Sequence, residues 1–564
     1  MTRYCFLILS ILCCFISCKK KPETQPKKGV IAKHAMVVSA RAEASKIGVD
    51  ILQQGGNAFD AMIATELALA VAYPYAGNLG GGGFMVYRKS NGETGVLDYR
   101  EKAPLAATKN MYLDENGNVI HDKSTLGAMA VGVPGTVAGV FAVHEKFGSL
   151  PMETILKPVI DLAYKGVIVT EKQSKRIKEY QPLFPKVNPD SIPFDKNWKV
   201  NDSIKYPVLA QTLERILKNG RDEFYKGETA KTLVHFIRAN GGIITLEDLE
   251  KYEAKWRNCI RFTYDDLTIY SVPPPSSGGI CLGQIMKMVE PFPLDEYDHN
   301  SLKYIQVITE AERRAFADRS FYLGDPDFVE IPEKALIDES YLSQRMADFS
   351  FEKATDSKAI SHGNIEIIES DETTHYSIVD TFGNAIAATT TLNGAYGSKL
   401  YCPELGFFLN NEMDDFSSKP GHPNMFGLIG AEANSIAPEK RMLSAMTPTI
   451  VEKNGKFYMS VGTPGGSTII TSVLQTILNV HEFDMGMQEA VNAPRFHHQW
   501  LPDYIRMEPY SFSKNIIEQL KEKGYSIKEE HAPVIGRVDG ILVLEDDTYE
   551  GGADYRGDDT AIGF

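Results

Sequence analysis

The sequence predicts a mixed α/β fold of the α+β kind, in which sheets and helices form layers around a buried core. Apolar residues recur every three and four positions over residues 42–53, and residues 58–72 are rich in alanine, so both segments are predicted helices. A strand, a turn and a second strand follow one another over residues 376–392. The same pattern returns over residues 448–461 around Asn454-Gly455, a dipeptide that strongly favours a hairpin turn.

The other predicted elements follow in chain order. Glycines occupy positions 80–83, and we expect tight backbone packing there, because the run lacks the Gly-Lys-Ser/Thr ending of a phosphate loop. The remaining elements are strands at 84–87 and 94–99, mainly helical stretches at 150–260 and 301–350, and helices at 467–480 and 487–493.

Composition excludes several classes of protein. The chain has 564 residues, of which 43% are hydrophobic and 24% charged, as is usual for a folded globular protein. Its formal charge of −15 argues against nucleic acid as a partner, because phosphates require a basic face. Outside the leader, the cysteines Cys259, Cys281 and Cys402 lack CxxC spacing, so we expect separate thiols, with one bridge at most and no zinc site.

The amino-terminal segment differs from the rest of the chain. Residues 1–18 have one arginine, then an apolar run too short to span a bilayer, which is typical of a secretory signal. The segment ends in Phe15-Ile16-Ser17-Cys18, which resembles a bacterial lipobox with Cys18 as the lipidated residue. Residues 19–30 form a Lys/Pro-rich tether. We therefore expect a lipid-anchored protein of the cell envelope, facing the periplasm or the cell surface; an ordinary signal peptide is the alternative.

Several motifs fail as catalytic or metal signatures when taken alone. Thr373-Thr374-His375 opens a predicted strand, where threonine is common for structural reasons. The segment 276–279 is not a nucleophile elbow of the G-x-S-x-G type. His497 and His498 are adjacent and point apart, so they make a poor metal pair. We expect no metal and no cofactor.

Many ordered segments nevertheless match one family. The chain resembles the γ-glutamyltranspeptidases, which are glutathione hydrolases of the N-terminal-nucleophile superfamily, from about residue 30 to the carboxyl terminus. This resemblance implies a four-layer αββα sandwich. The segments that carry it are 57–61, 78–84, 97–101, 273–279, 373–380, 410–417, 464–467 and 492–500.

The resemblance also implies self-cleavage between Glu372 and Thr373. A large chain, residues 31–372, and a small catalytic chain, residues 373–564, would then form a heterodimer with one core. The cut has a chemical reason, since a threonine hydroxyl needs a base, and a new α-amine with a pKa of roughly 7.7–8.0 can serve near neutral pH. Nucleophile and base would then belong to one residue.

The same resemblance assigns roles to other residues. Thr391 would bind the nucleophilic hydroxyl, and Gly465 and Gly466 would form the oxyanion hole, where backbone amides stabilise developing negative charge. A guanidinium fork suits a planar carboxylate. Arg100 and Ser444 would bind the glutamyl α-carboxylate, and Ala445 stands where the family often has a second serine. Asn393, Glu412 and Asp415 would bind the α-ammonium. A lid at 419–434 would cover the site, with Phe426 in place of a tyrosine.

Three functions remain open at this point. The first is a self-processing γ-glutamyltransferase and hydrolase that acts on glutathione and other γ-glutamyl compounds, with water or an amino-acid or peptide amine as acceptor. The second keeps the fold but cleaves side-chain acyl amides, as related β-lactam acylases do. The third is a non-catalytic surface lipoprotein that binds peptides.

Overall fold

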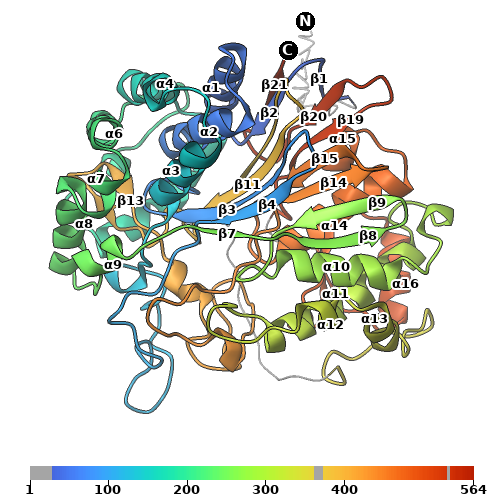
Figure 1. Ribbon diagram of the computed structural model, residues 1–564. Coiled ribbons are helices and arrows are strands. Elements are labelled where there is room, and N and C mark those ends of the chain that lie inside the picture. Colours follow the sequence, from blue (N-terminus) through green and yellow to red (C-terminus); the bar gives the residue numbers. More distant parts are fainter. Residues whose placement is uncertain (1–27, 361–372, 530–533) are drawn as a thin grey trace, which may run out of the picture.

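The computed structural model describes residues 28–360, 373–529 and 534–564. Its centre is a pair of seven-stranded antiparallel sheets packed face to face, with helices on both outer faces (Figure 1). The order of layers is therefore helix, sheet, sheet, helix, which confirms the predicted αββα sandwich. The leader, residues 1–18, most of the tether, residues 19–27, and Glu372 lie outside the described residues.

The first sheet contains the second predicted hairpin at its centre. Asn454 and Gly455 both have positive φ, at 53° and 73°, as this type of turn requires. The strands, in spatial order, are β1 (Val30–Ala32), β20 (Tyr549–Gly552), β19 (Asp539–Val543), β15 (Lys456–Gly462), β14 (Thr449–Lys453), β9 (Leu267–Ser271) and β8 (Ile260–Tyr264).

The second sheet contains the first predicted hairpin at its centre. Thr374 pairs with Thr390 and Val379 with Ala385, so the hairpin register is regular over its whole length. The strands, in spatial order, are β21 (Thr560–Gly563), β2 (Met36–Ser39), β10 (Thr374–Val379), β11 (Ala385–Thr391), β3 (Gly82–Arg88), β4 (Thr94–Asp98) and β7 (Lys255–Arg257).

The alternating direction of side chains along the strands explains the four layers. In β3, Phe84 and Val86 enter the apolar layer between the two sheets, whereas Met85 faces the helices. Successive side chains of a strand point to opposite faces, so a strand that is apolar at every position must be covered on both sides. The central strands therefore need a helical layer on each outer face.

Helices α1 (Ala42–Gln53) and α2 (Ala58–Ala72) cover the outer face of the second sheet (Figure 1). Asn57 caps α2 by accepting hydrogen bonds from the backbone N–H groups of Phe59 and Asp60, at 2.9 and 3.0 Å. Every residue of α2 is buried, which its high content of alanine permits by allowing close helix packing. Helices α10 (Gly278–Val289) and α14 (Thr468–Glu482) cover the first sheet in the same way, and α11 (Leu302–Tyr322) packs on α10.

The remaining elements surround this sandwich. The stretch predicted to be mainly helical at 150–260 is so, but it also contains a small two-stranded sheet. The helices are α3 (Thr136–Phe147), α4 (Met152–Lys165), α5 (Glu171–Tyr180), α6 (Pro207–Asn219), α7 (Arg221–Tyr225), α8 (Glu228–Ala239), α9 (Leu246–Glu250), α12 (Glu333–Leu336), α13 (Glu339–Arg345), α15 (Met487–Asn492) and α16 (Lys514–Glu522). The short strands are β5 (Val167–Ile168), β6 (Ser203–Ile204), β12 (Tyr401–Cys402), β13 (Phe407–Phe408), β16 (Phe496–His497), β17 (Ile505–Met507) and β18 (Ile527–Lys528).

Two further predictions concern thiols and membranes. Cys259, Cys281 and Cys402 are all free, which confirms the expectation of separate thiols. Within the three described ranges, none of the helices combines the length and apolar character of a membrane-spanning segment.

A buried acid lies beneath the central hairpin. Glu66 of α2 accepts a hydrogen bond of 2.7 Å from the Tyr376 hydroxyl of β10. Burial raises the pKa of Glu66 to about 7, although this hydrogen bond acts in the opposite direction. Because the pKa is higher in the folded state, the folded protein binds more protons, and stability falls as pH rises from about 4.5 to about 7.

Glu66→Gln is therefore expected to remove this part of the pH dependence. The free energy of unfolding of the variant, relative to the parent, should rise by about 3 kcal/mol between pH 4.5 and pH 8, since each pKa unit corresponds to 1.36 kcal/mol. Chemical denaturation of both proteins across that range measures the difference. Parallel stability profiles would show that Glu66 keeps an ordinary pKa.

Candidate active site

A narrow pocket lies where the central hairpin of the second sheet meets the amino-terminal end of α14. The room it leaves for water-sized molecules is about 20 Å³. Eight residues that the sequence analysis assigned to catalysis or binding line it, with four apolar neighbours. The lining residues are Arg100, Thr373, Thr391, Asn393, Asp415, Phe426, Leu428, Ser444, Ala445, Met446, Gly466 and Ile469.

Thr373 directly precedes β10 and is only 4% exposed. The hairpin places Thr391, the last residue of β11, at the same end of the sheet, where it pairs with Gly82 of β3. The Thr391 hydroxyl oxygen accepts a 2.7 Å hydrogen bond from the backbone N–H of Asn393. Thr373 and Thr391 both line this pocket, whereas the hydrogen bond predicted between their side chains stays a prediction.

The glycine run at 80–83 permits this arrangement. A Cβ atom on Gly81 would lie 2.1 Å from the Thr391 carbonyl oxygen, and one on Gly83 would lie 2.3 Å from that of Thr389. Real Cβ atoms do not approach so closely, so glycine is required where β3 and the residue before it pack against β11. The expected tight backbone packing is confirmed.

Gly465 and Gly466 form the turn that precedes α14. Their φ angles are 138° and 52°, in the region that side chains disfavour. The Thr468 hydroxyl donates a 2.7 Å hydrogen bond to the Gly465 carbonyl oxygen, which fixes the turn. A helix amino terminus presents backbone N–H groups and a positive dipole end, so this turn can stabilise an oxyanion near Thr373.

Arg100 is the centre of a buried ion cluster. Its guanidinium contacts the Glu412 carboxylate and lies 2.5 Å from Asp415 Oδ2 and 3.6 Å from Glu101 Oε2. Burial alone would lower the pKa of Arg100, but Glu412 and Asp415 outweigh it and hold the pKa above its ordinary value. Burial raises the pKa of Glu412 to about 7 and also raises that of Asp415, against the opposing effect of Arg100.

Glu101 is a further acid of this cluster, for which no role was predicted from the sequence. Its side chain is fully buried, and neither carboxylate oxygen has a hydrogen-bond partner among the described residues. Burial holds the pKa of Glu101 well above its usual range. The only signal in the sequence was its place beside Arg100 in the family-like segment 97–101.

The segment 273–279 holds Ser444 in place. The Ser277 backbone N–H and hydroxyl both donate to the Ser444 carbonyl oxygen, at 2.8 and 2.7 Å. The Ser444 N–H donates to the Pro275 carbonyl oxygen at 2.8 Å. Ala445 also lines the pocket, where it presents a methyl group instead of a hydroxyl.

The lid at 419–434 borders the pocket and forms hydrogen bonds to Asp415 in the pocket wall. Asn424 Nδ2 donates a 2.8 Å hydrogen bond to Asp415 Oδ1, and Asn434 Nδ2 donates one of 2.7 Å to the Asp415 carbonyl oxygen. The Phe426 ring is 4% exposed and forms part of the pocket wall. Asn393 Nδ2 approaches Met425 Sδ at 3.7 Å, so the lid contacts both faces of the pocket.

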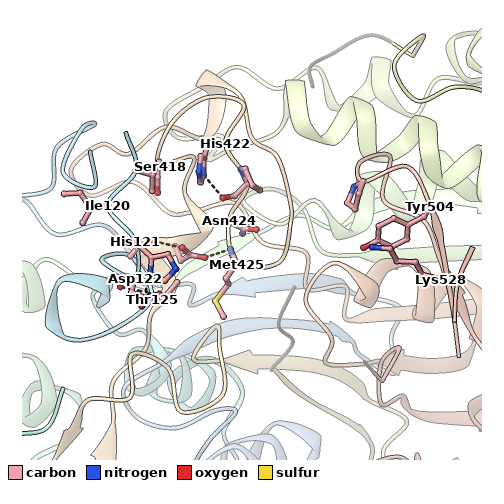
Figure 2. Close-up of a pocket in the computed structure, with 15 residues that line it drawn as sticks. Ile120, His121, Asp122, Thr125, Ser418, His422, Asn424, Met425, Tyr504 and Lys528 are labelled. Atoms are coloured by element: carbon pink, nitrogen blue, oxygen red, sulfur yellow. Dashed lines mark hydrogen bonds and ion pairs between the residues drawn. The ribbon is translucent and has the colours of Figure 1, made fainter. Parts of the chain in front are cut away.

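A second, open hollow of about 770 Å³ adjoins the outer side of the lid. In Figure 2, His121 and His422 lie on one side of this hollow and Tyr504 and Lys528 on the other. Lys528 Nζ lies 4.0 Å from the centre of the Tyr504 ring. Asp414, Asn424 and Met425 belong to its lining, so part of the lid forms a wall of the hollow, and Met425 also contacts Asn393 of the narrow pocket.

The two adjacent histidines have separate structural partners. His497 Nδ1 lies 2.9 Å from the Thr471 hydroxyl, whereas His498 Nε2 lies 3.2 Å from Asp503 Oδ1. Burial lowers the pKa of both rings, to about 4 for His498. The two imidazoles therefore contribute to packing, as the sequence analysis expected.

The αββα sandwich, with a threonine directly before an inner strand and a glycine turn beside it, defines an N-terminal-nucleophile hydrolase. The fold alone has a near counterpart in the cephalosporin acylase of Bacillus halodurans, with a TM-score of 0.84, 24% identity, and coverage of 97% of this chain and 98% of that one. The γ-glutamyltranspeptidase of Helicobacter pylori gives a TM-score of 0.56 at 39% identity over 60% of this chain and 97% of that one.

Sequence comparison identifies the family. Residues 44–564 match the family described as gamma-glutamyltranspeptidase. The glutathione hydrolase proenzyme of Escherichia coli (strain K12) is 45% identical over 540 residues, covering 95% of this chain and 93% of that protein. That of Bacillus subtilis (strain 168) is 37% identical and covers 97% and 94%. The chain belongs to the γ-glutamyltranspeptidase family and is a self-processing enzyme, which excludes the non-catalytic alternative.

Proposed function

We propose that the chain cleaves γ-glutamyl amides, glutathione among them, through a γ-glutamyl ester on the Thr373 hydroxyl. The observation that carries this proposal is one pocket in which Thr373 adjoins the Gly466 turn and the Arg100–Asp415 ion pair. A hydrolase that recognises an amino-acid head group needs both a nucleophile with an oxyanion site and paired charges for the head group.

Processing comes first in this scheme. Hydrolysis of the bond between Glu372 and Thr373 leaves a carboxylate on Glu372 and an α-amine on Thr373, and separates residues 31–372 from residues 373–564. The two chains remain together as a heterodimer, because both central strands of the hairpin belong to the small chain and pair with β2 and β3 of the large chain. The amine then takes the proton of the Thr373 hydroxyl as that oxygen attacks the γ-carbonyl carbon.

The rest of the turnover follows from the pocket. Negative charge on the carbonyl oxygen is stabilised by the N–H groups of the Gly465–Gly466 turn. Collapse of the intermediate expels the amine of the substrate, which carries away the proton held by the Thr373 amine. Water or a second amine then attacks the ester, and Thr391 keeps the threonine oxygen oriented in both steps.

The head group binds by entering the ion cluster. Its α-carboxylate accepts hydrogen bonds from the Arg100 guanidinium and from Ser444. Its α-ammonium donates hydrogen bonds to Glu412, Asp415 and the Asn393 side chain. Both substrate charges thus replace contacts that Arg100 and the two acids make with each other. Because the pocket is narrow, the lid must move outward for the glutamyl group to enter.

A glutaryl-amide acylase is the second candidate function. Ala445 favours it, as does a 32% identity to the acylase ACY 1 proenzyme of Pseudomonas sp. (strain V22) over 97% of this chain and 95% of that protein. The two are separated by assaying a γ-glutamyl anilide beside a glutaryl anilide, which lacks only the α-ammonium. We expect a preference for the γ-glutamyl compound; a preference for the glutaryl compound would overturn the proposal.

N-terminal sequencing of the small chain tests the cleavage site, and the sequence read should begin at Thr373.

We propose further that amino-acid or peptide acceptors bind in the hollow beside the lid (Figure 2). An acceptor amine attacks the same carbonyl from which the first amine departed, so microscopic reversibility gives both amines one site. Lys528, His121 and His422 offer positive charge or hydrogen bonds to the acceptor carboxylate. The hollow has a volume of about 770 Å³, which suffices for a dipeptide.

Lys528→Ala is expected to lower the ratio of transfer to hydrolysis up to about fivefold, since a solvent-exposed ion pair contributes up to about 1 kcal/mol. Glycylglycine as acceptor, with product analysis by chromatography, measures this ratio. Lys521→Ala, an equally exposed lysine of α16 outside the hollow, is the matched control and should leave the ratio unchanged. A ratio that is equal in both variants would place acceptors elsewhere.

We propose, finally, that Cys18 is lipidated and that residues 19–30 tether the enzyme to the cell envelope, facing the periplasm or the cell surface. The lipobox-like segment 15–18 supports this. Cys18→Ala should move activity from the membrane fraction to the soluble fraction, with metabolic labelling by palmitate lost in parallel. Labelling that survives the substitution would reject Cys18 as the anchor.

A further inference from the structure

A cluster of metal-ligating side chains lies at the carboxyl-terminal end of α14, away from the active-site pocket. Asp265 and Asp266 form the turn between β8 and β9, and His481 belongs to the last turn of α14. The helix has 15 residues, so about 20 Å of helix separates this end from the glycine turn that precedes it. The proposed catalytic chemistry makes no use of these three residues.

The three side chains face one another. His481 Nε2 lies 3.1 Å from Asp265 Oδ2, and His481 Nδ1 lies 3.9 Å from Asp266 Oδ1. One ligand atom from each residue can be chosen so that all three lie within 4.8 Å of one another. Ligands of a tetrahedral zinc ion stand roughly 3.3 Å apart, so small side-chain rotations would complete such a site.

The histidine is held firmly and keeps one nitrogen unused. Its side chain is 8% exposed, and its ring packs edge to face on Tyr264 with 5.7 Å between centroids. Among the described residues, His481 Nδ1 is a buried nitrogen without a hydrogen-bond partner. A buried polar atom that lacks such a bond is costly, so the ion would take this nitrogen, which faces Asp266. One imidazole gives an ion only one nitrogen, so the exposed Asp265 side chain would rotate away from Nε2 to reach it.

Electrostatics at this place favours a cation. The carboxyl-terminal end of a helix carries a partial negative charge, which adds to the two aspartates. Lys453 Nζ lies 3.4 Å from Asp266 Oδ2 and offsets part of that charge. A neutral imidazole with two carboxylates is a ligand set for divalent first-row transition metals rather than for calcium or magnesium, which prefer oxygen alone.

We propose that Asp265, Asp266 and His481 bind one divalent transition-metal ion, with water as the remaining ligand. The ion joins the β8–β9 turn to the end of α14 and so ties the edge of the first sheet to the helix whose other end forms the oxyanion turn. A metal was not expected from the sequence, because Asp265 and His481 are 216 residues apart and form no motif.

Zn²⁺ titrated into the processed protein by calorimetry near neutral pH tests the proposal. We expect one ion per protein and a higher midpoint of thermal unfolding with Zn²⁺, since a ligand that binds only the folded state stabilises it. Asp265→Asn, Asp266→Asn and His481→Gln should each weaken binding at least about tenfold. The two aspartates are exposed, so their variants should fold even if the buried His481→Gln does not.

Asp546→Asn/Asp547→Asn is the matched control, because these exposed aspartates occupy the turn between β19 and β20 outside the metal-ligating cluster. It should bind Zn²⁺ as the parent does. With Co²⁺ in place of Zn²⁺, the parent should show the visible absorption of a low-coordinate ion, and Asp266→Asn should lose it. Absence of binding in the parent, or equal binding in the parent and all three cluster variants, would overturn the proposal and leave an ordinary His–Asp ion pair.

Discussion

Thr373→Ala is expected to remain one continuous chain and to cleave γ-glutamyl amides at least about 10⁴-fold more slowly than the parent, as the loss of a nucleophile typically causes. Alanine has no hydroxyl, so it can neither support processing nor form the glutamyl ester. Thr373 is 4% exposed, and the removal of its hydroxyl and methyl groups leaves the strand pairing of the hairpin intact. Denaturing electrophoresis and an anilide assay measure the two effects.

Two variants separate a chemical role from a structural one. Thr373→Ser keeps both a hydroxyl and, after cleavage, an α-amine, so it should process and turn over, although more slowly. Thr374→Ala removes a hydroxyl from the next residue, the first of β10, and should still yield two chains. Recovery of two chains with normal turnover from Thr373→Ala would exclude Thr373 as the nucleophile.

Local chemistry allowed much of the fold to be predicted. The Asn454-Gly455 turn and the alanine-rich helix at 58–72 depend on residues close together in sequence, and both occur as expected. The position of Thr373 at the head of a buried hairpin was also visible, because strand alternation and a central turn determine the register. Resemblance to a family supplied the partners of Thr373, which come from distant parts of the chain.

The mutual contacts of the charged residues could not be predicted in this way. Arg100 and Glu412 are 312 residues apart, and the sequence analysis assigned them to opposite charges of one substrate. The structure shows that they first bind each other, because a buried guanidinium needs carboxylates when no substrate is present. Glu66 and Tyr376 illustrate the same limit, since their hydrogen bond depends on how α2 packs on β10.

Arg100→Gln is expected to lower kcat/KM for a γ-glutamyl anilide by about 10² to 10³-fold, because truncating one partner of a buried charge pair costs about 2–5 kcal/mol. Glutamine cannot present the two parallel N–H groups that hold a carboxylate. The variant should also lose about 3–5 kcal/mol of stability, because the carboxylates of Glu101, Glu412 and Asp415 lose the guanidinium that contacts all three.

The pH dependence of Arg100→Gln gives the sharper test. Arg100 lowers the pKa of Glu412 and Asp415, so its removal raises both further above their ordinary values. An acid whose pKa is raised in the folded state makes the protein less stable as pH rises. The free energy of unfolding of the variant should therefore fall further below that of the parent from pH 4.5 to above 7. Arg100→Gln/Glu412→Gln should recover stability but not kcat/KM, while Arg100→Lys should keep stability and lose part of the binding. If the double variant regained activity, Arg100 would serve only to neutralise the acids and would not bind the substrate carboxylate.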